Sequence, residues 1–141
     1  MIVTIIPKEY LSNVWPEASG YIEAAWDRAP GYYSAKDILD RIIKDLEVLW
    51  GVYDEERNMI GCFTTAIEEY PQARIMVITA LSGKDLEAWY EKALDIVKKY
   101  SVDQGCSRLE ARGRGGWTAY AKKTGWETVG MTYKIDLQSE D

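Results

Sequence analysis

The chain has 141 residues, a formal net charge of −6 and no histidine. This length predicts one domain, residues 1–141, that buries about two-thirds of the surface of its unfolded chain. The lack of histidine excludes Ser-His and Cys-His nucleophile pairs, and the acidic balance argues against binding to nucleic acid or to an anionic membrane. Cys62 and Cys106 are too widely separated to suggest a zinc site or a disulfide framework, which fits a reducing, cytoplasmic setting. We expect no signal peptide and no membrane span.

The first half of the chain predicts a strand, two helices and a hairpin. Residues 2–6 are an apolar, β-branched run that ends at a proline. Apolar residues at helical spacing predict a helix within 15–30, with Pro16 in its first turn. A second helix should run from Ser34, in a capping box with Asp37, to about residue 46. The runs 48–53 and 59–67 flank a polar loop and predict two antiparallel strands.

The stretch 73–112 predicts two parallel strands joined by a helix. Residues 74–79 and 108–112 have strand character, and apolar residues between 84 and 100 recur at helical spacing. Ser82 and Asp85 suggest a capping box that starts this helix. A strand, helix and strand in this order require a right-handed crossover. The free N–H groups and the dipole at the start of the helix would favour a bound phosphate.

The end of the chain predicts a short helix and a last strand. The helix should cover 117–124 and end at Gly125. Apolar and polar residues then alternate from 128 to 137, the pattern of a strand with one buried face. The apolar positions are Val129, Met131, Tyr133, Ile135 and Leu137. The fold class expected is α/β, a mixed sheet of about six or seven strands in the order β-α-α-β-β-β-α-β-α-β, with helices on both faces.

This order of elements resembles the GNAT superfamily of N-acetyltransferases over nearly the whole chain. Residue pairs in the second half resemble in particular the short, stand-alone GNAT-like proteins of tailed phages. These pairs are Gly105-Cys106, Leu109-Glu110, Gly113-Arg114, Gly116-Trp117 and Gly125-Trp126. The resemblance implies a GNAT-like fold and acetyl-CoA as substrate, with no metal. It places the pantetheine in a gap between strands 75–79 and 108–112, and the diphosphate at residues 80–85.

The cofactor-binding residues that the resemblance implies lie in this gap, on this turn and in the glycine-rich stretch. They are Val77, Ile78, Thr79, Leu81, Ser82, Gly83, Lys84 and Arg114. The diphosphate loop of the superfamily follows R/Q-x-x-G-x-G/A. With Gly83 as its first glycine, this chain has Ala80 at the Arg/Gln position and Asp85 at the final position. A capped helix that binds nothing is therefore the alternative at this turn. For the glycines that flank Arg114, the alternative is that they serve only the turn itself.

Acetyl transfer to an amine needs a base for the amine proton and an acid for the leaving thiolate. On strand 108–112, Glu110 shares a face with Arg108 and Arg112 and is the candidate base, with a salt-bridge ladder as the alternative. Tyr120 is the candidate acid. The superfamily often has a tyrosine where this chain has Ala121, and Tyr120 lies about 100° further around the helix, so packing is its alternative role.

Two functions follow. The first is an acetyl-CoA-dependent N-acetyltransferase that acts by direct transfer to a small-molecule or protein amine. The second is a non-catalytic GNAT-like module, phage-encoded, that works through a protein partner or a homo-oligomer by its Trp and Tyr side chains. The location expected is the cytoplasm, that of the host for a phage-encoded protein, with association with the virion for the second function.

Overall fold

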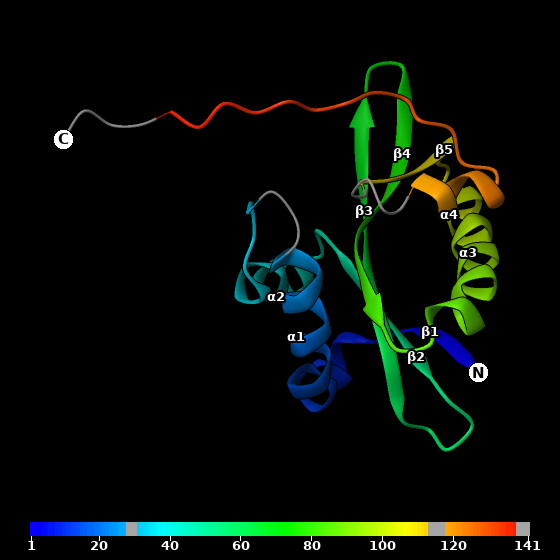
Figure 1. Cartoon of the computed structure of the whole chain (residues 1–141). Helices are drawn as coiled ribbons and strands as arrows, with labels where there is room; N and C mark the ends of the chain where they lie inside the picture. The colour runs from blue at the N-terminus through cyan, green and yellow to red at the C-terminus, as the bar shows by residue number, and fades with distance from the viewer. Residues whose placement is uncertain (28–30, 113–117, 138–141) are drawn as a thin grey trace.

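A mixed sheet with the strand order β1-β2-β3-β4-β5 lies at the centre of the structure (Figure 1). The computed structural model describes residues 1–27, 31–112 and 118–137, with the backbone alone at 118–120. The first three strand pairs are antiparallel and β4 and β5 are parallel. The strands are β1 (Ile2–Ile5), β2 (Val48–Tyr53), β3 (Met59–Tyr70), β4 (Ala73–Gly83) and β5 (Arg108–Ala111).

Helices cover both faces of this sheet, as predicted. Helices α1 and α2 lie on one face, and α3 and α4 on the other (Figure 1). The helices are α1 (Leu11–Asp27), α2 (Ala35–Ile43), α3 (Leu86–Asp103) and α4 (Thr118–Lys123), with a 3-10 turn at Lys8–Tyr10. No described helix combines the length and the apolar character that a bilayer span requires.

Each face has its own apolar core. On the α1 and α2 face, Ala18, Ile22 and Ile38 are completely buried. On the α3 face, the rings of Trp50 and Phe63 stack with centroids 5.4 Å apart, and Trp89 of α3 packs on Phe63 at 6.5 Å. Much of the unusual tryptophan content therefore fills the core, because every described tryptophan is buried or half-buried.

The two predicted capping boxes have different outcomes. The box at α2 is confirmed: the Ser34 N–H donates to Asp37 Oδ2 at 2.8 Å and the Asp37 N–H to Ser34 Oγ at 3.2 Å. The box at α3 is wrong. Ser82 lies in β4, opposite Cys62 of β3, and α3 begins at Leu86 after Asp85, whose side chain makes no capping hydrogen bond. Pairing with β3 extends β4 beyond the predicted end and delays the helix.

Other predicted boundaries also shift. Helix α1 starts at Leu11, so Pro16 lies inside the helix and not in its first turn. Helix α2 ends at Ile43, before the predicted residue 46. The parallel crossover from β4 through α3 to β5 is confirmed.

The predicted last strand is wrong for the chain as the structure describes it. Residues 126–137 are extended but pair with no strand of the described sheet, which accounts for a smaller strand count than predicted. This segment runs beyond the packed elements (Figure 1). Alternation shows only that one face of a segment is apolar; a strand also requires an edge to pair with.

Candidate functional site

The sheet opens where β5 ends. Strands β4 and β5 pair from Ile75 and Arg108 to Ile78 and Ala111, so the gap predicted between 75–79 and 108–112 is closed along most of its length. β4 then continues to Gly83, paired with β3 alone. In the described chain, the edge of β4 from Thr79 onward therefore has no β5 partner for its backbone groups, and we call this unpaired edge the opening.

A β-bulge marks the start of this opening. Thr65 lies opposite Ile78 and Thr64 opposite Ala80, so Thr79 is the extra residue. A bulge interrupts the ladder, re-aims side chains and occurs often beside functional sites. Here it turns the Thr79 hydroxyl toward Thr64 Oγ1, 2.6 Å away, and toward a buried carboxylate.

That carboxylate belongs to Glu47, a residue that the sequence analysis missed. Its side chain is only 1% exposed and is held by two donors, Arg41 Nε at 2.8 Å and the Thr79 hydroxyl. Because Thr79 donates to Glu47, the Thr64 hydroxyl is free to donate to Thr79. The chain of hydrogen bonds thus ties α2 and the start of β2 to the bulge of β4. The one available signal was an acidic residue at the start of an apolar run.

A second ion pair crosses the same part of the sheet. Arg112, directly after β5, donates to both carboxylate oxygens of Glu68 on β3, at 3.0 and 2.8 Å, and the Tyr70 hydroxyl donates at 2.6 Å. The hydrogen bond from Arg112 holds the pKa of Glu68 below its ordinary value of 4.5, and Glu68 in turn raises the pKa of Tyr70. Glu68 is thus a carboxylate at neutral pH, and the pair spans β4 from one neighbouring strand to the other.

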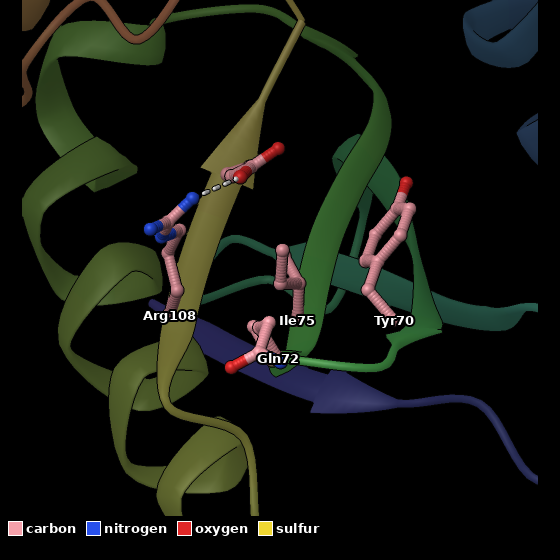
Figure 2. A pocket seen from close by; sticks show the side chains of 6 residues that line it. Tyr70, Gln72, Ile75 and Arg108 are labelled. Atoms are coloured by element: carbon pink, nitrogen blue, oxygen red, sulfur yellow. Dashed lines mark hydrogen bonds and ion pairs between the residues drawn. The ribbon is translucent and has the colours of Figure 1, made fainter.

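Glu110 lies on the predicted face of β5, beside Arg108. Arg108 Nη1 is 3.2 Å from Glu110 Oε2, so the salt-bridge alternative describes its contact in this structure. Both residues line an open pocket of about 350 Å³ at the start of β4, with Tyr70, Gln72, Ala73 and Ile75. Figure 2 shows these side chains around the hollow between β5, β4 and the turn after β3. Glu110 is opposite Val77, one pair before the opening.

The residues predicted to bind the cofactor follow β4 in order. Val77 and Ile78 are buried in the strand, Thr79 forms the bulge, and Lys84 is exposed. Leu81, Ser82 and Gly83 pair with β3. Gly83 has a packing reason to be glycine: a Cβ there would lie 2.6 Å from Gly61 Cα and 3.0 Å from the ring of Trp89.

Three further predicted features concern the end of the chain and the cysteines. Arg114 lies outside the described residues, as does the side chain of Tyr120 in α4. The α4 region is joined to α3 through the Trp126 indole N–H, which donates to the Tyr90 hydroxyl at 2.8 Å.

The Cys62 thiol is not suited to nucleophilic chemistry. Burial raises the pKa of this thiol to about 12, so the thiol is neutral and a poor nucleophile. Among the described residues, no cluster of three acidic or cysteine side chains is arranged to hold a metal.

Solved structures with the same arrangement include acetyltransferases. The ribosomal-protein-alanine N-acetyltransferase from Brucella melitensis superposes with a TM-score of 0.72 at 10% identity, over 97% of this chain and 100% of the other. Glucosamine-6-phosphate N-acetyltransferase from Arabidopsis thaliana gives 0.64 at 11% identity, over 96% and 98%. A GNAT family acetyltransferase from Staphylococcus aureus gives 0.61 at 14% identity, over 95% and 98%.

The chain has the GNAT fold. No family model matches its sequence. No curated protein matches it either. At such low identity the GNAT likeness is one of fold, and the chemistry must be argued from the residues at the opening.

Proposed function

We propose that this GNAT-fold chain is an acetyl-CoA-dependent N-acetyltransferase that transfers the acetyl group directly to an amine. The observation that carries the proposal is the opening at Thr79, where a bulge and the end of β5 leave the edge of β4 free next to the turn into α3. An extended pantetheine arm can pair with such an edge as a strand would. The diphosphate would then lie near Lys84 and the first N–H groups of α3.

In the transfer step, the amine nitrogen attacks the thioester carbonyl, an amide bond forms and the C–S bond breaks. Glu110 would take the amine proton, directly or through water, after exchanging its contact with Arg108. Tyr120 would protonate the leaving thiolate. The two acceptors named in the GNAT-fold structures, a protein alanine and a sugar phosphate amine, support a primary amine as the acceptor class.

The first test is calorimetric titration with acetyl-CoA at two salt concentrations. The Asp85→Asn variant removes the charge before α3 and suits the left-handed backbone there, since Asp85 has φ 52°. We expect micromolar binding that salt weakens and that Asp85→Asn strengthens, because a carboxylate opposes the diphosphate. Asp95→Asn, an exposed acid further along α3, should leave the affinity unchanged. No heat from any form would overturn the proposal.

A second candidate is a GNAT-fold module without catalysis. It is favoured by the packing role of Gly83 and by the carboxylate of Asp85 at the turn where the superfamily binds diphosphate. In the same titration this candidate predicts no acetyl-CoA binding by the native protein or by Asp85→Asn. If acetyl-CoA does bind, Glu110→Gln should lower the rate of acetyl transfer to an amine acceptor by about 10²–10⁴-fold.

A further inference from the structure

The β-bulge at Thr79 is held by side chains on both faces of the sheet. On the face covered by α1 and α2, the Thr79 hydroxyl lies 2.6 Å from the Thr64 hydroxyl and 3.2 Å from the Thr64 carbonyl oxygen. On the α3 face, the Trp50 indole N–H donates to the Thr65 hydroxyl at 3.0 Å. Thr64 and Thr65 are the residues of β3 between which the register shifts, and both are completely buried. Buried side-chain hydrogen bonds therefore support the bulge in addition to the strand ladder.

Glu47 is the charged partner in this arrangement. Its carboxylate accepts from the Thr79 hydroxyl. A hydrogen bond to a charged acceptor is about twice as strong as one between neutral groups. The Thr79 proton therefore goes to Glu47 in preference to the Thr64 carbonyl oxygen. Glu47 thus sets the orientation of the Thr79 side chain.

The Glu47 carboxylate is itself fixed from the side of α2. Arg41 Nε donates to it at 2.8 Å, and the Arg41 guanidinium lies over the ring of Tyr33, 5.3 Å from its centre. The turn between α2 and β2 is closed by the Leu46 N–H, which donates to the Arg41 carbonyl oxygen at 2.8 Å. A side chain held in this way can hold another group at a defined point.

Stability alone gives no reason for a carboxylate at this position. The Glu47 side chain is only 1% exposed, and a buried ion pair contributes little compared with apolar side chains of similar size. Leu49, two residues along β2, belongs to the apolar core on the α1 and α2 face. An apolar residue at 47 would extend this core. What the carboxylate supplies instead is a fixed acceptor beside Thr79.

We propose that Glu47 is a positioning residue, which acts through Thr79 to fix the backbone of the opening for acetyl-CoA; this rests on the proposed function. Ile78 is the last residue of β4 with a β5 partner, and Ala80 is the next residue with a β3 partner. In the described sheet, Thr79 has a register partner in neither strand. The strands alone leave the direction of its peptide groups undetermined. Fixing these groups before binding lowers the ordering cost that a ligand pays at this edge.

Calorimetric titration with acetyl-CoA tests the positioning role. The double variant Arg41→Met/Glu47→Met replaces the ion pair by apolar side chains, a kind of change that is often neutral for stability. We expect it to bind acetyl-CoA about tenfold more weakly than the native protein, the value of one charge-assisted hydrogen bond.

Val97→Ala is the control for a loss of stability. Val97 is buried in the second half of α3, away from the opening, so this variant should be less stable but should bind acetyl-CoA as the native protein does. If the native protein gives no heat, the proposed function fails and the positioning role fails with it. If the native protein binds and Arg41→Met/Glu47→Met binds equally well, the positioning role alone fails.

Thr79→Val shows whether Glu47 acts through Thr79. Valine has the shape of threonine without the hydroxyl, so this variant should weaken binding by itself. Adding Arg41→Met and Glu47→Met to it should have no further effect, because effects that pass through one contact are not additive. Thr79→Ser, which keeps the hydroxyl, should recover the larger part of the lost affinity. A further loss on combining the three substitutions would show that Glu47 acts by another route, and would contradict the proposal.

Discussion

The carboxylate of Glu47 shows what a single buried charge requires of its surroundings. Both of its oxygens accept hydrogen bonds, from Arg41 on α2 and Thr79 on β4. In Glu47→Gln the amide keeps one acceptor and turns an NH₂ group toward a donor. We expect the free energy of unfolding to fall by about 1–3 kcal/mol, the cost of an unsatisfied buried group. Urea titration measures it.

The control for this variant is Asp45→Asn, two residues earlier. Its side chain is 77% exposed and pairs with Lys8 at the surface. The expected change is within about 0.5 kcal/mol, as for surface substitutions in general. If Glu47→Gln and Asp45→Asn lower the free energy of unfolding by the same amount, the buried hydrogen bonds of Glu47 make no special contribution to stability.

Residue spacing predicted part of this site and could not predict the rest. The shared face of Arg108 and Glu110 follows from the period of a strand, and the structure has their side chains in contact. The contact of Glu47 with Thr79 joins residues 32 apart in sequence. It depends on the bulge in β4, which one extra residue creates and which no residue type in the sequence marks. Tertiary contacts of this kind leave no local pattern.

At the scale of elements, the same capping motif gave one correct and one wrong helix start. Residues 31–34, directly before α2, belong to no strand, so nothing competes with the helix for the backbone of Ser34 and Asp37. Ser82 lies inside β4, whose partner β3 is long enough to pair as far as Gly83, and Asp85 comes only after the strand. The extra strand hydrogen bonds outweigh a cap that contributes about 1 kcal/mol. Local motifs therefore predict helix starts only where no strand continues through them.

The close approach of β3, β4 and α3 gives a prediction for this junction. In Gly83→Ala the new Cβ would lie 2.6 Å from Gly61 Cα and 2.7 Å from the Ile60 carbonyl oxygen, which are backbone atoms. We expect about 1–3 kcal/mol of destabilisation by overpacking, measured by chemical unfolding.

Gly20→Ala is the matched control. Gly20 lies inside α1, and a Cβ there would meet no atom within 4 Å. The same substitution should stabilise the protein by about 0.5–1 kcal/mol, because alanine favours the helix. If Gly83→Ala instead stabilised the protein as Gly20→Ala does, the close packing at Gly83 would have been misjudged.

For the whole molecule, the predicted layers were correct and the predicted last strand was not. Helical and strand periods identify which faces are buried, and this was enough to place helices on both sides of a mixed sheet with one parallel crossover. These periods do not say which strand of the sheet a further strand would pair with. The segment 126–137 has the pattern of a strand and, in the described chain, no partner for it. The missing information is the identity of the neighbour.

Acid stability tests the link between β3 and the end of β5. The pKa of Glu68 is lowered in the folded protein by Arg112, so folding favours the carboxylate. This contribution of the Glu68 carboxylate to folding stability is complete when the pH is above the ordinary glutamate pKa of about 4.5. It is lost as the pH falls through the lower pKa of Glu68 in the folded state. Because the side chain is 32% exposed, we expect Glu68→Gln to cost only about 0.5–1 kcal/mol at pH 7. Unfolding measured from pH 7 to pH 3 should show the native protein and the variant converging at the acid end.

Glu69→Gln is the control for this variant. Because the Glu69 side chain is 68% exposed, the substitution should cost less stability at pH 7 than Glu68→Gln. A difference between the native protein and Glu68→Gln that stays constant down to pH 3 would show that the carboxylate acts by shape and not by charge.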